Sequence, residues 1–359
     1  MKKILAMLLA LCMILALAAC GAAPAQQPAE QPAEQSAEQP AEQPAEQPAE
    51  QPAEAEYKLG LGVNVNLNGS DGANAQVDAT AIAVVLDAEG KIVAARLDVA
   101  QNKMDVTDGQ VDTEAAFLTK YEKGDDYNMV KFSDATLEWY EQAANFEAFL
   151  IGKTVEEIKA TETVEDGGHI VFADEELHAS CSISVAEFIE AAVKACEDEQ
   201  AMSFTSDGNF TLGLAINSTA AESAAATAEA DGVVKMYSEF GAVVVDGEGK
   251  ILAALTDSIQ PQITINAEGV VETKFVGTKR ELKEDYNMVK FSDATLEWYE
   301  QAWNFVNFAL GKTADELKAT ETVEDGGHNV FADEELHASC SISIQGMINV
   351  LAKAVEMAR

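Results

Sequence analysis

The chain has 359 residues, of which 62 are acidic and 23 are basic, and its formal net charge at pH 7 is −39. Binding to phosphate backbones requires a basic surface, so this composition excludes nucleic acid as a partner. The roughly 300 residues that follow the low-complexity N-terminal segment suit two domains better than one.

The first 20 residues have the pattern of an export signal. Lys2 and Lys3 precede an apolar run over residues 4–16, and small residues lead directly into Cys20. The run is shorter than the roughly 20 residues that a membrane-spanning helix needs. A small-residue cleavage site before a cysteine resembles a bacterial lipoprotein signal. This resemblance implies a signal peptide over 1–20 and an extracytoplasmic protein anchored in the cell membrane by lipid on Cys20.

Residues 21–56 form a Gln-Pro-Ala-Glu repeat. Seven of the eight prolines of the chain lie between Pro24 and Pro52. A segment this polar and rich in proline cannot bury a core, so it predicts a disordered, extended linker between the anchor and the folded part.

An internal repeat organises the rest of the chain. Residues 126–184 reappear as residues 285–343, with 50 of 59 positions identical. We therefore expect two tandem repeat domains, over 57–200 and 201–359, and two copies of any functional site. The halves that precede these blocks are less similar to each other. In the second block, Trp303 and Val306 replace Ala144 and Glu147, and the more apolar helix predicts a contact between the domains.

The first half of each repeat predicts antiparallel strands. In the first repeat, a glycine-rich segment over 57–68 precedes an apolar segment over 80–86, a turn at 87–90 and another apolar segment over 91–97. Two apolar runs joined by such a turn are typical of a β-hairpin. The corresponding segments of the second repeat are 210–215, 241–245, 246–249 and 250–255. Further hairpin turns are predicted near Asp108-Gly109 and Glu268-Gly269.

The second half of each repeat predicts helices. Ser133 is a suitable N-cap for a helix that ends near Gly152. Thr154 begins a capping box, repeated at Thr313, and Ser184 begins another that is incomplete in the second repeat, where Gly346 replaces the glutamate. Strands followed by helices predict an α+β fold for each domain, with an antiparallel sheet and helices packed on one face.

The order of these parts resembles the FMN-binding domain, which occurs in membrane electron-transport subunits and in surface flavoprotein lipoproteins. The shared features are a glycine-rich strand, a hairpin turn of the form Asp-x-x-Gly-Lys-Ile, a Gly-Lys-Thr helix start and a hydroxyl-rich turn before the last helix. In that family the last hydroxyl of the turn carries FMN through a phosphoester bond. The resemblance implies FMN as cofactor, with Ser182 and Ser341 as the matching acceptors in the turns 179–182 and 338–341.

Several serines surround these acceptors just ahead of the last helix of each repeat. The N–H groups at a helix start favour a phosphate, although the same serines could equally serve only as helix caps. The candidate cofactor-binding residues are Ser180, Ser182, Ser184, Ser339, Ser341 and Ser343. The aromatic residues that could flank a flavin ring, or simply belong to the core, are Tyr127, Trp139, Tyr286 and Trp298.

All four histidines of the chain lie in the repeated blocks, and with nearby cysteines they provide an alternative ligand cluster for a transition metal. This cluster consists of His169, His178, Cys181, His328, His337 and Cys340. The spacing of these residues matches no established metal motif, so exposed or hydrogen-bonded histidines are an equally open interpretation. Cys196 has no counterpart in the second repeat, which argues against a disulfide framework and predicts free thiols.

The residues leave two main functions open, with a metal-binding lipoprotein as the third. One is surface electron transfer by tandem FMN-binding-like domains, in which the flavin performs the redox chemistry with a redox partner at the surface. The other is a non-enzymatic module that binds a solute, a cell-wall component or a partner protein. Both describe a binding or carrier protein rather than a catalyst.

Overall fold

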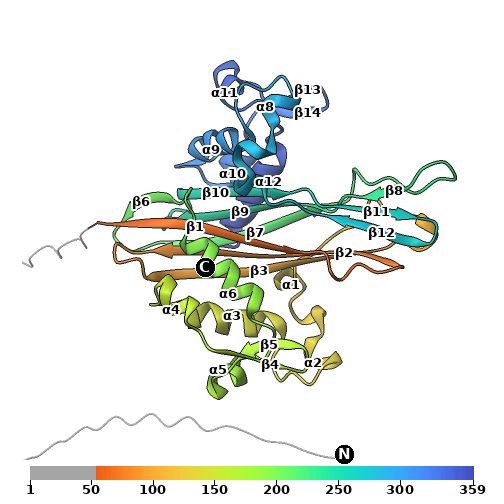
Figure 1. Cartoon of the computed structure of the whole chain (residues 1–359). Coiled ribbons are helices and arrows are strands. Elements are labelled where there is room, and N and C mark those ends of the chain that lie inside the picture. The colour runs from red at the N-terminus through yellow and green to blue at the C-terminus, as the bar shows by residue number, and fades with distance from the viewer. Residues whose placement is uncertain (1–53) are drawn as a thin grey trace, which may run out of the picture. The chain divides into compact units, whose positions relative to one another are not determined.

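The computed structural model of this protein describes residues 54–359. The predicted signal peptide, Cys20 and nearly all of the predicted linker lie outside this range. The described residues form one compact unit of antiparallel sheets and helices (Figure 1), which confirms the predicted α+β class. Within this part of the chain, none of the helices is long and apolar enough to cross a membrane.

One four-stranded antiparallel sheet contains the strands of the first repeat. Its spatial order is β3 (Ile92–Asp105), β2 (Asn74–Leu86), β1 (Ala55–Asn66) and β6 (Met202–Ser206). The predicted hairpin turn is confirmed, since the Gly90 amide donates to the Asp87 carbonyl and Gly90 has a positive φ of 75°. Strand β6 follows the predicted domain boundary at residue 200, yet it pairs with β1 of the first repeat.

The second repeat forms two three-stranded sheets. The larger has the order β10 (Ile251–Ile259), β9 (Tyr237–Val245) and β7 (Thr211–Thr219). The smaller has the order β12 (Gly269–Lys274), β11 (Gln262–Asn266) and β8 (Gly232–Val234). The predicted turn at Glu268-Gly269 is therefore confirmed. The equivalent prediction at Asp108-Gly109 is wrong, because a short 3-10 helix, η1 (Thr107–Gly109), ends the extended chain there and no return strand follows.

The helical halves have the same order in both repeats, and each includes a small two-stranded hairpin. In the first repeat the elements are α1 (Lys120–Lys123), η2 (Gly124–Tyr127), α2 (Met129–Phe132), α3 (Trp139–Leu150), α4 (Val155–Lys159), β4 (Thr163–Asp166), β5 (His169–Phe172), α5 (Glu175–Ser180) and α6 (Ala186–Cys196). In the second they are α7 (Lys279–Leu282), η3 (Lys283–Tyr286), α8 (Met288–Phe291), α9 (Trp298–Ala309), α10 (Ala314–Lys318), β13 (Thr322–Asp325), β14 (His328–Phe331), α11 (Glu334–Ser339) and α12 (Gln345–Glu356).

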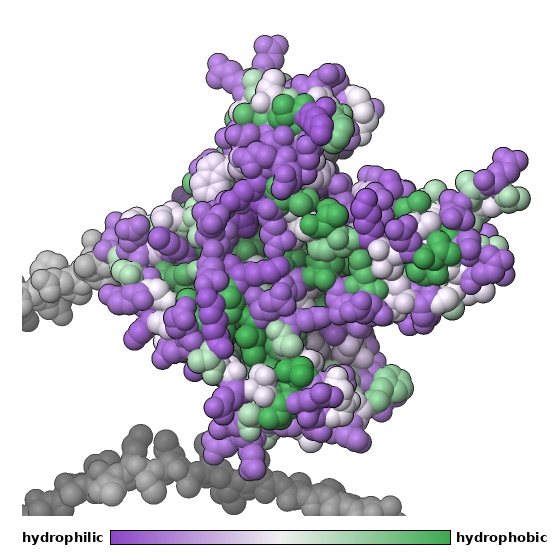
Figure 2. Space-filling view, in the orientation of Figure 1, coloured by the Kyte–Doolittle hydropathy of each residue, from purple (hydrophilic) through white to green (hydrophobic). Residues whose placement is uncertain are grey.

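The two large sheets lie face to face, and each repeat places its helices on the outer face of its own sheet (Figure 1). Strand β2 shows why both faces are apolar. Its odd-numbered residues from Ala75 to Val85 are buried in a core shared with the second repeat, whereas Ile82 and Val84 pack against α3 and α6. Because side chains alternate along a strand, a strand between two apolar layers reads as a continuous apolar run. Hydrophilic residues cover most of the face in Figure 2.

Two ion pairs join the repeats reciprocally, each between a lysine on the last helix of one repeat and a glutamate of the other. Lys194 on α6 contacts Glu281 of the second repeat at 2.8 Å, and Lys353 on α12 contacts Glu122 of the first at 2.7 Å. The two pairs join equivalent positions, since each residue has its counterpart 159 positions away. This reciprocity is the pattern of an isologous interface, here formed within one chain.

The more apolar helix of the second repeat, with Trp303 and Val306, was predicted to contact the other domain. Val306 is buried, whereas Trp303 remains 39% exposed. In the first repeat it is Glu147 that reaches the other repeat, since its carboxylate lies 3.3 Å from the Arg359 guanidinium. The same carboxylate accepts a hydrogen bond from the Leu97 amide at 2.8 Å. The acidic residue thus adds an ion pair between the repeats, while Val306 is buried in the core that both repeats share.

Helix starts were predicted with mixed success. The capping boxes at Thr154 and Thr313 are confirmed. Ser133 does not begin α3, because it ends α2, and Glu138 precedes the first turn of α3. The box at Ser184 is also wrong, since Val185 is the N-cap residue of α6 and makes no capping hydrogen bond with its side chain. Glu187, the glutamate expected to complete this box, accepts hydrogen bonds from the side chains of Asn66 and Thr80 instead.

Glycines in β1 and β7 allow the last helix of each repeat to pack closely on the sheet. A Cβ atom on Gly60 would lie 2.0 Å from the Ala195 carbonyl oxygen of α6, and one on Gly213 would lie 1.9 Å from the Ala354 carbonyl oxygen of α12. Such distances require the backbone of the helix to move. The glycine-rich strands predicted from the sequence therefore serve helix packing.

We expect Gly60→Ala to lower the free energy of unfolding by about 1–3 kcal/mol, because the added methyl group forces α6 away from the sheet. Gly72→Ala is the matched control, since a Cβ atom there meets nothing within 4 Å. Urea unfolding of both variants provides the measurement. Equal stabilities of the two variants would contradict the close-packing argument.

A buried ion pair between the repeats provides a second test. Arg280 contacts Asp198 at 3.0 Å, and both side chains are only 8% exposed. Removal of one partner leaves a buried charge unpaired, so Arg280→Gln should lower the free energy of unfolding by about 3–5 kcal/mol. Lys283→Gln breaks the neighbouring exposed pair with Glu199 and should change stability little. A comparably large effect of Lys283→Gln in thermal unfolding would contradict this assignment.

Candidate functional site

Each repeat contains one large pocket, and the two pockets lie at equivalent places. Their volumes are about 730 Å³ in the first repeat and about 830 Å³ in the second, within the range of small-molecule and cofactor sites. The equivalent residues that line both pockets include Lys120 and Lys279, Tyr127 and Tyr286, Trp139 and Trp298, His169 and His328, His178 and His337, Ser182 and Ser341, and Ser184 and Ser343. Apart from the two lysines, which precede the block, these residues all belong to the repeated block, which thus builds the same wall twice.

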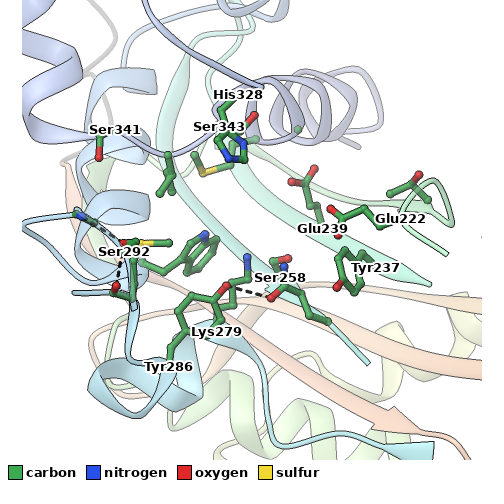
Figure 3. A pocket seen from close by; sticks show the side chains of 18 of the residues that line it. Glu222, Tyr237, Glu239, Ser258, Lys279, Tyr286, Ser292, His328, Ser341 and Ser343 are labelled. Carbon is green, nitrogen blue, oxygen red and sulfur yellow. Dashed lines mark hydrogen bonds between the residues drawn. The ribbon is translucent and has the colours of Figure 1, made fainter. Parts of the chain in front are cut away.

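Figure 3 shows the pocket of the second repeat. Ser341, Ser343 and His328 lie on one side of the cavity, and Lys279 and Tyr286 lie on the other. The elements that meet here are the strands β9 and β10, the short helices α7 and α8, and the turn before α12. The pocket is therefore open between the sheet and the segments that enter the last helix.

A lysine lies against two aromatic rings in each pocket. The Lys279 ammonium is 5.0 Å from the centre of the Tyr286 ring and 5.2 Å from that of Trp298. Lys120 lies 5.2 Å from Tyr127 and 5.6 Å from Trp139. These distances allow cation–π attraction. Burial lowers the pKa of Lys279 to about 8, although Glu239 and Asp257 oppose the shift.

Buried aspartates fix the short helices that carry these lysines. Asp98 accepts hydrogen bonds from the Val99 amide at 2.7 Å and from the Tyr121 amide, in the first turn of α1, at 3.1 Å. Asp257 accepts equivalent bonds from the Ser258 and Arg280 amides, at 2.7 and 3.1 Å. Burial raises the pKa of Asp98 to about 7 and that of Asp257 to about 6. Each lysine thus sits on a helix start held by a buried carboxyl group.

A glutamine holds the serine turn of each repeat. The Gln142 side-chain oxygen accepts from the Ser182 amide at 2.8 Å, from the Ile183 amide at 3.2 Å and from the Ser182 hydroxyl at 3.2 Å. Gln301 makes the same three bonds with Ser341 and Ile342. These amides and the hydroxyls of Ser182 and Ser341 therefore all donate to the glutamine, and both serines also line the pockets.

The remaining serines separate into two groups. Ser180 and Ser339 do not line the pockets, and their hydroxyls donate to the carbonyls of Leu177 and Leu336 at 2.9 and 2.8 Å. Ser184 and Ser343 line the pockets but are not the N-cap residues of α6 and α12. The alternative that these two serines cap the last helices is therefore wrong.

The histidines reach the pockets, but the cysteines do not. His169 and His328 are exposed, whereas Cys181 and Cys340 are buried free thiols whose pKa burial raises to about 12. A thiol with such a pKa is a poor nucleophile and a poor metal ligand at neutral pH. Over residues 54–359, no three His, Cys, Asp or Glu side chains are grouped so that they could hold a metal ion. The structure thus gives no support to the alternative ligand cluster.

Sequence reasoning missed the residues that the strands contribute. Asp78, Thr80 and Val99 line the first pocket, and their counterparts Tyr237, Glu239 and Ser258 line the second. The lysines on α1 and α7 were missed as well. Their capping boxes, Thr119 with Glu122 and Thr278 with Glu281, are the signal that could have located those helices. The floors of the two pockets therefore differ, although the repeated walls are the same.

Comparison with known proteins gives one partial likeness. A chlorophenol reductase of Desulfitobacterium hafniense is 34% identical over 94 residues, which cover 22% of this chain and 29% of the reductase. The chain thus spans less than a third of the length of that relative. No family model and no solved structure matches the chain.

The buried aspartates predict a specific pH dependence. The unfolded chain ionises Asp98 near pH 4, whereas the folded protein holds the proton until about pH 7. Between these values the folded state binds more protons, so the free energy of unfolding falls as the pH rises. Asp98→Asn combined with Asp257→Asn should flatten that fall, as measured by urea unfolding from pH 4 to pH 7.

Asp105→Asn is the control for this measurement. Hydrogen bonds from Thr107 hold the pKa of the exposed Asp105 below its ordinary value, so its contribution is lost only as the pH falls below about 4. Its replacement should leave the slope between pH 4 and pH 7 as it is in the native protein. An unchanged slope in the double variant would contradict the protonation of the buried aspartates.

Proposed function

We propose that this protein is an extracytoplasmic lipoprotein, anchored through lipid on Cys20, whose two pockets bind a flavin of the FMN type and pass electrons at the cell surface. The observation that carries this proposal is the pair of equivalent pockets, each built from the repeated block and each of cofactor size. The likeness to a reductase over 94 residues supports a redox role.

The side chains that line the pockets suit a flavin. Tyr127 and Tyr286 are half-buried and supply aromatic surface for a planar ring, whereas Trp139 and Trp298 are almost fully buried in the core behind them. Lys120 and Lys279 supply positive charge for the electron-rich edge of a flavin or for its phosphate. The Ser182 and Ser341 hydroxyls supply the position for a phosphoester bond. A bound flavin would accept and donate the electrons, while the chain would position it and limit its contact with water.

The turn before the last helix contributes a hydroxyl rather than an anion site. Its amides donate to Gln142 or Gln301, so a phosphate there would have to be held by the serine itself. A phosphoester bond satisfies that requirement without the amides. Attachment at Ser182 and Ser341 would require their hydroxyls to release the hydrogen bonds that they donate to Gln142 and Gln301.

A second candidate is a cofactor-free surface module with two related binding faces. The difference between the pocket floors favours it, because Asp78 and Val99 in one pocket correspond to Tyr237 and Ser258 in the other. Two different floors suit two different small ligands. This function needs the same anchor and linker but no flavin.

We expect the full chain to carry flavin when it is produced in a bacterium that exports lipoproteins and attaches flavin to extracytoplasmic proteins. The measurement is visible absorption of the purified protein, repeated after denaturation and filtration. Flavin that stays with the denatured chain indicates covalent attachment. Ser182→Ala with Ser341→Ala should then abolish the retained absorbance.

Ser180→Ala with Ser339→Ala is the matched control. These serines belong to the same turns but do not line the pockets, so the retained flavin should be unchanged. Flavin released on denaturation would indicate noncovalent binding in the same pockets. A colourless protein that also fails to bind added FMN would overturn the proposed function and favour the cofactor-free module.

A further inference from the structure

We propose that each pocket requires one carboxylate beside the start of its last helix, and that Glu187 and Glu239 supply this same ligand-binding group from different elements. The inference rests on the proposed function, because the ligand considered is a flavin. It identifies a group that decides how this ligand is oriented. The evidence is that a glutamate changes place between two pairs of equivalent positions in the two repeats.

The two positions exchange their residues between the repeats. Thr80 on β2 corresponds to Glu239 on β9, and Glu187 on α6 corresponds to Gly346 on α12, each 159 residues apart. The first repeat therefore has the glutamate on the helix and a small residue on the strand. The second repeat has the reverse. Each repeat keeps one glutamate and one smaller residue.

The exchanged residues meet in space in both repeats. In the first, the Glu187 carboxylate accepts from the side-chain Nδ2 of Asn66 at 2.9 Å and from the Thr80 hydroxyl at 3.4 Å. In the second, a Cβ atom on Gly346 would lie only 2.0 Å from a Glu239 carboxylate oxygen. The Glu239 carboxylate thus fills the place where a side chain would leave α12. A glutamate at both positions of one repeat would put two carboxylates in one place.

The start of the helix accounts for part of this arrangement. N–H groups and the helix dipole at the first turn favour a negative charge, and neither α6 nor α12 has a capping hydrogen bond from its N-cap side chain. A carboxylate at this place stabilises the helix in both repeats. It also occupies the position at which a helix start could otherwise hold the ligand phosphate.

The exposure of the carboxylates indicates a second role. Both Glu187 and Glu239 line a pocket and are only half-buried. Among the described residues, no donor group forms a hydrogen bond with the Glu239 carboxylate. Glu239 lies on the pocket side of β9, near Glu222 and Tyr237 (Figure 3). Burial raises the pKa of Glu239, and the positive charge of Lys279 opposes this shift and favours the ionised form, whose oxygens can accept hydrogen bonds from a ligand.

The chemistry of a carboxylate decides which part of the ligand lies there. An ionised carboxylate only accepts hydrogen bonds and repels phosphate. The neighbouring ligand group must then be a donor, either the imide N–H of the flavin ring or a hydroxyl of its sugar-alcohol chain. The phosphate must lie elsewhere in the pocket. Loss of the carboxylate should therefore weaken the binding of FMN and of riboflavin, which has no phosphate, by the same factor.

The test uses the full chain produced in a host that does not attach flavin, so that free FMN and riboflavin can be titrated by fluorescence quenching. Glu187→Gln with Glu239→Gln keeps the side-chain shapes but removes both charges. One hydrogen bond to a charged group corresponds to about 10- to 100-fold in the dissociation constant. We expect a loss of this size for both ligands.

An exchange variant provides the decisive comparison. Thr80→Glu, Glu187→Gly, Glu239→Thr and Gly346→Glu together give each repeat the arrangement of the other and leave the net charge unchanged. We expect this variant to bind both flavins about as tightly as the native chain. The double variant that only removes the glutamates, Glu187→Gly with Glu239→Thr, should bind both flavins weakly. Thermal unfolding of every variant checks that the fold is retained.

Three outcomes would overturn the inference. Native affinity in the glutamine variant would show that the carboxylates serve only the helix. Weak binding by a folded exchange variant would show that the two glutamates are not equivalent. A loss confined to riboflavin, or tighter binding of FMN, would place the phosphate beside the carboxylate. If the native chain binds neither flavin, the proposed function itself fails, and this result differs from all three.

Discussion

The face-to-face packing of the two large sheets is the constraint on which the rest of the structure depends. The inner faces of β1 and β2 share one apolar core with β7, β9 and β10. With these faces covered, each repeat can place its helices only on the outer side of its own sheet, as an amphipathic helix must bury its apolar stripe. Two equivalent ion pairs, Lys194 with Glu281 and Lys353 with Glu122, connect the two repeats outside this core.

The close approach of the last helix to the sheet then creates the pockets. Gly60 and Gly213 allow α6 and α12 to contact the strands through backbone atoms. This packing brings the start of each helix, and the serine turn before it, over the strand residues that form the pocket floor. The buried Asp98 and Asp257 hold the lysine-bearing helices opposite that turn. The pocket is thus a consequence of helix packing together with two fixed helix starts.

The two pockets combine a common wall with different floors. The wall comes from the block in which 50 of 59 residues agree, whereas the floor comes from the strands that have diverged. The carboxylate beside the last helix comes from Glu187 on α6 in the first repeat and from Glu239 on β9 in the second. Under the proposed function, the two pockets would place two flavins in different surroundings and give them different potentials.

The sequence by itself determined the repeat, the α+β class, the hairpin at Asp87 to Gly90 and the capping boxes at Thr154 and Thr313, because these follow from patterns among neighbouring residues. It also drew attention to Ser182 and Tyr127, which line the first pocket, because both lie in the duplicated block. The start of α3 was missed because its N-cap residue is Glu138, paired locally with Glu141, and glutamate is not a usual N-cap residue. The partners of Glu187 depended on tertiary contacts that local propensity cannot anticipate. Only the tertiary structure decided the pairing of β6 with β1, the shared core and the floor residues, because segments far apart in the chain meet there to bury both faces of each sheet.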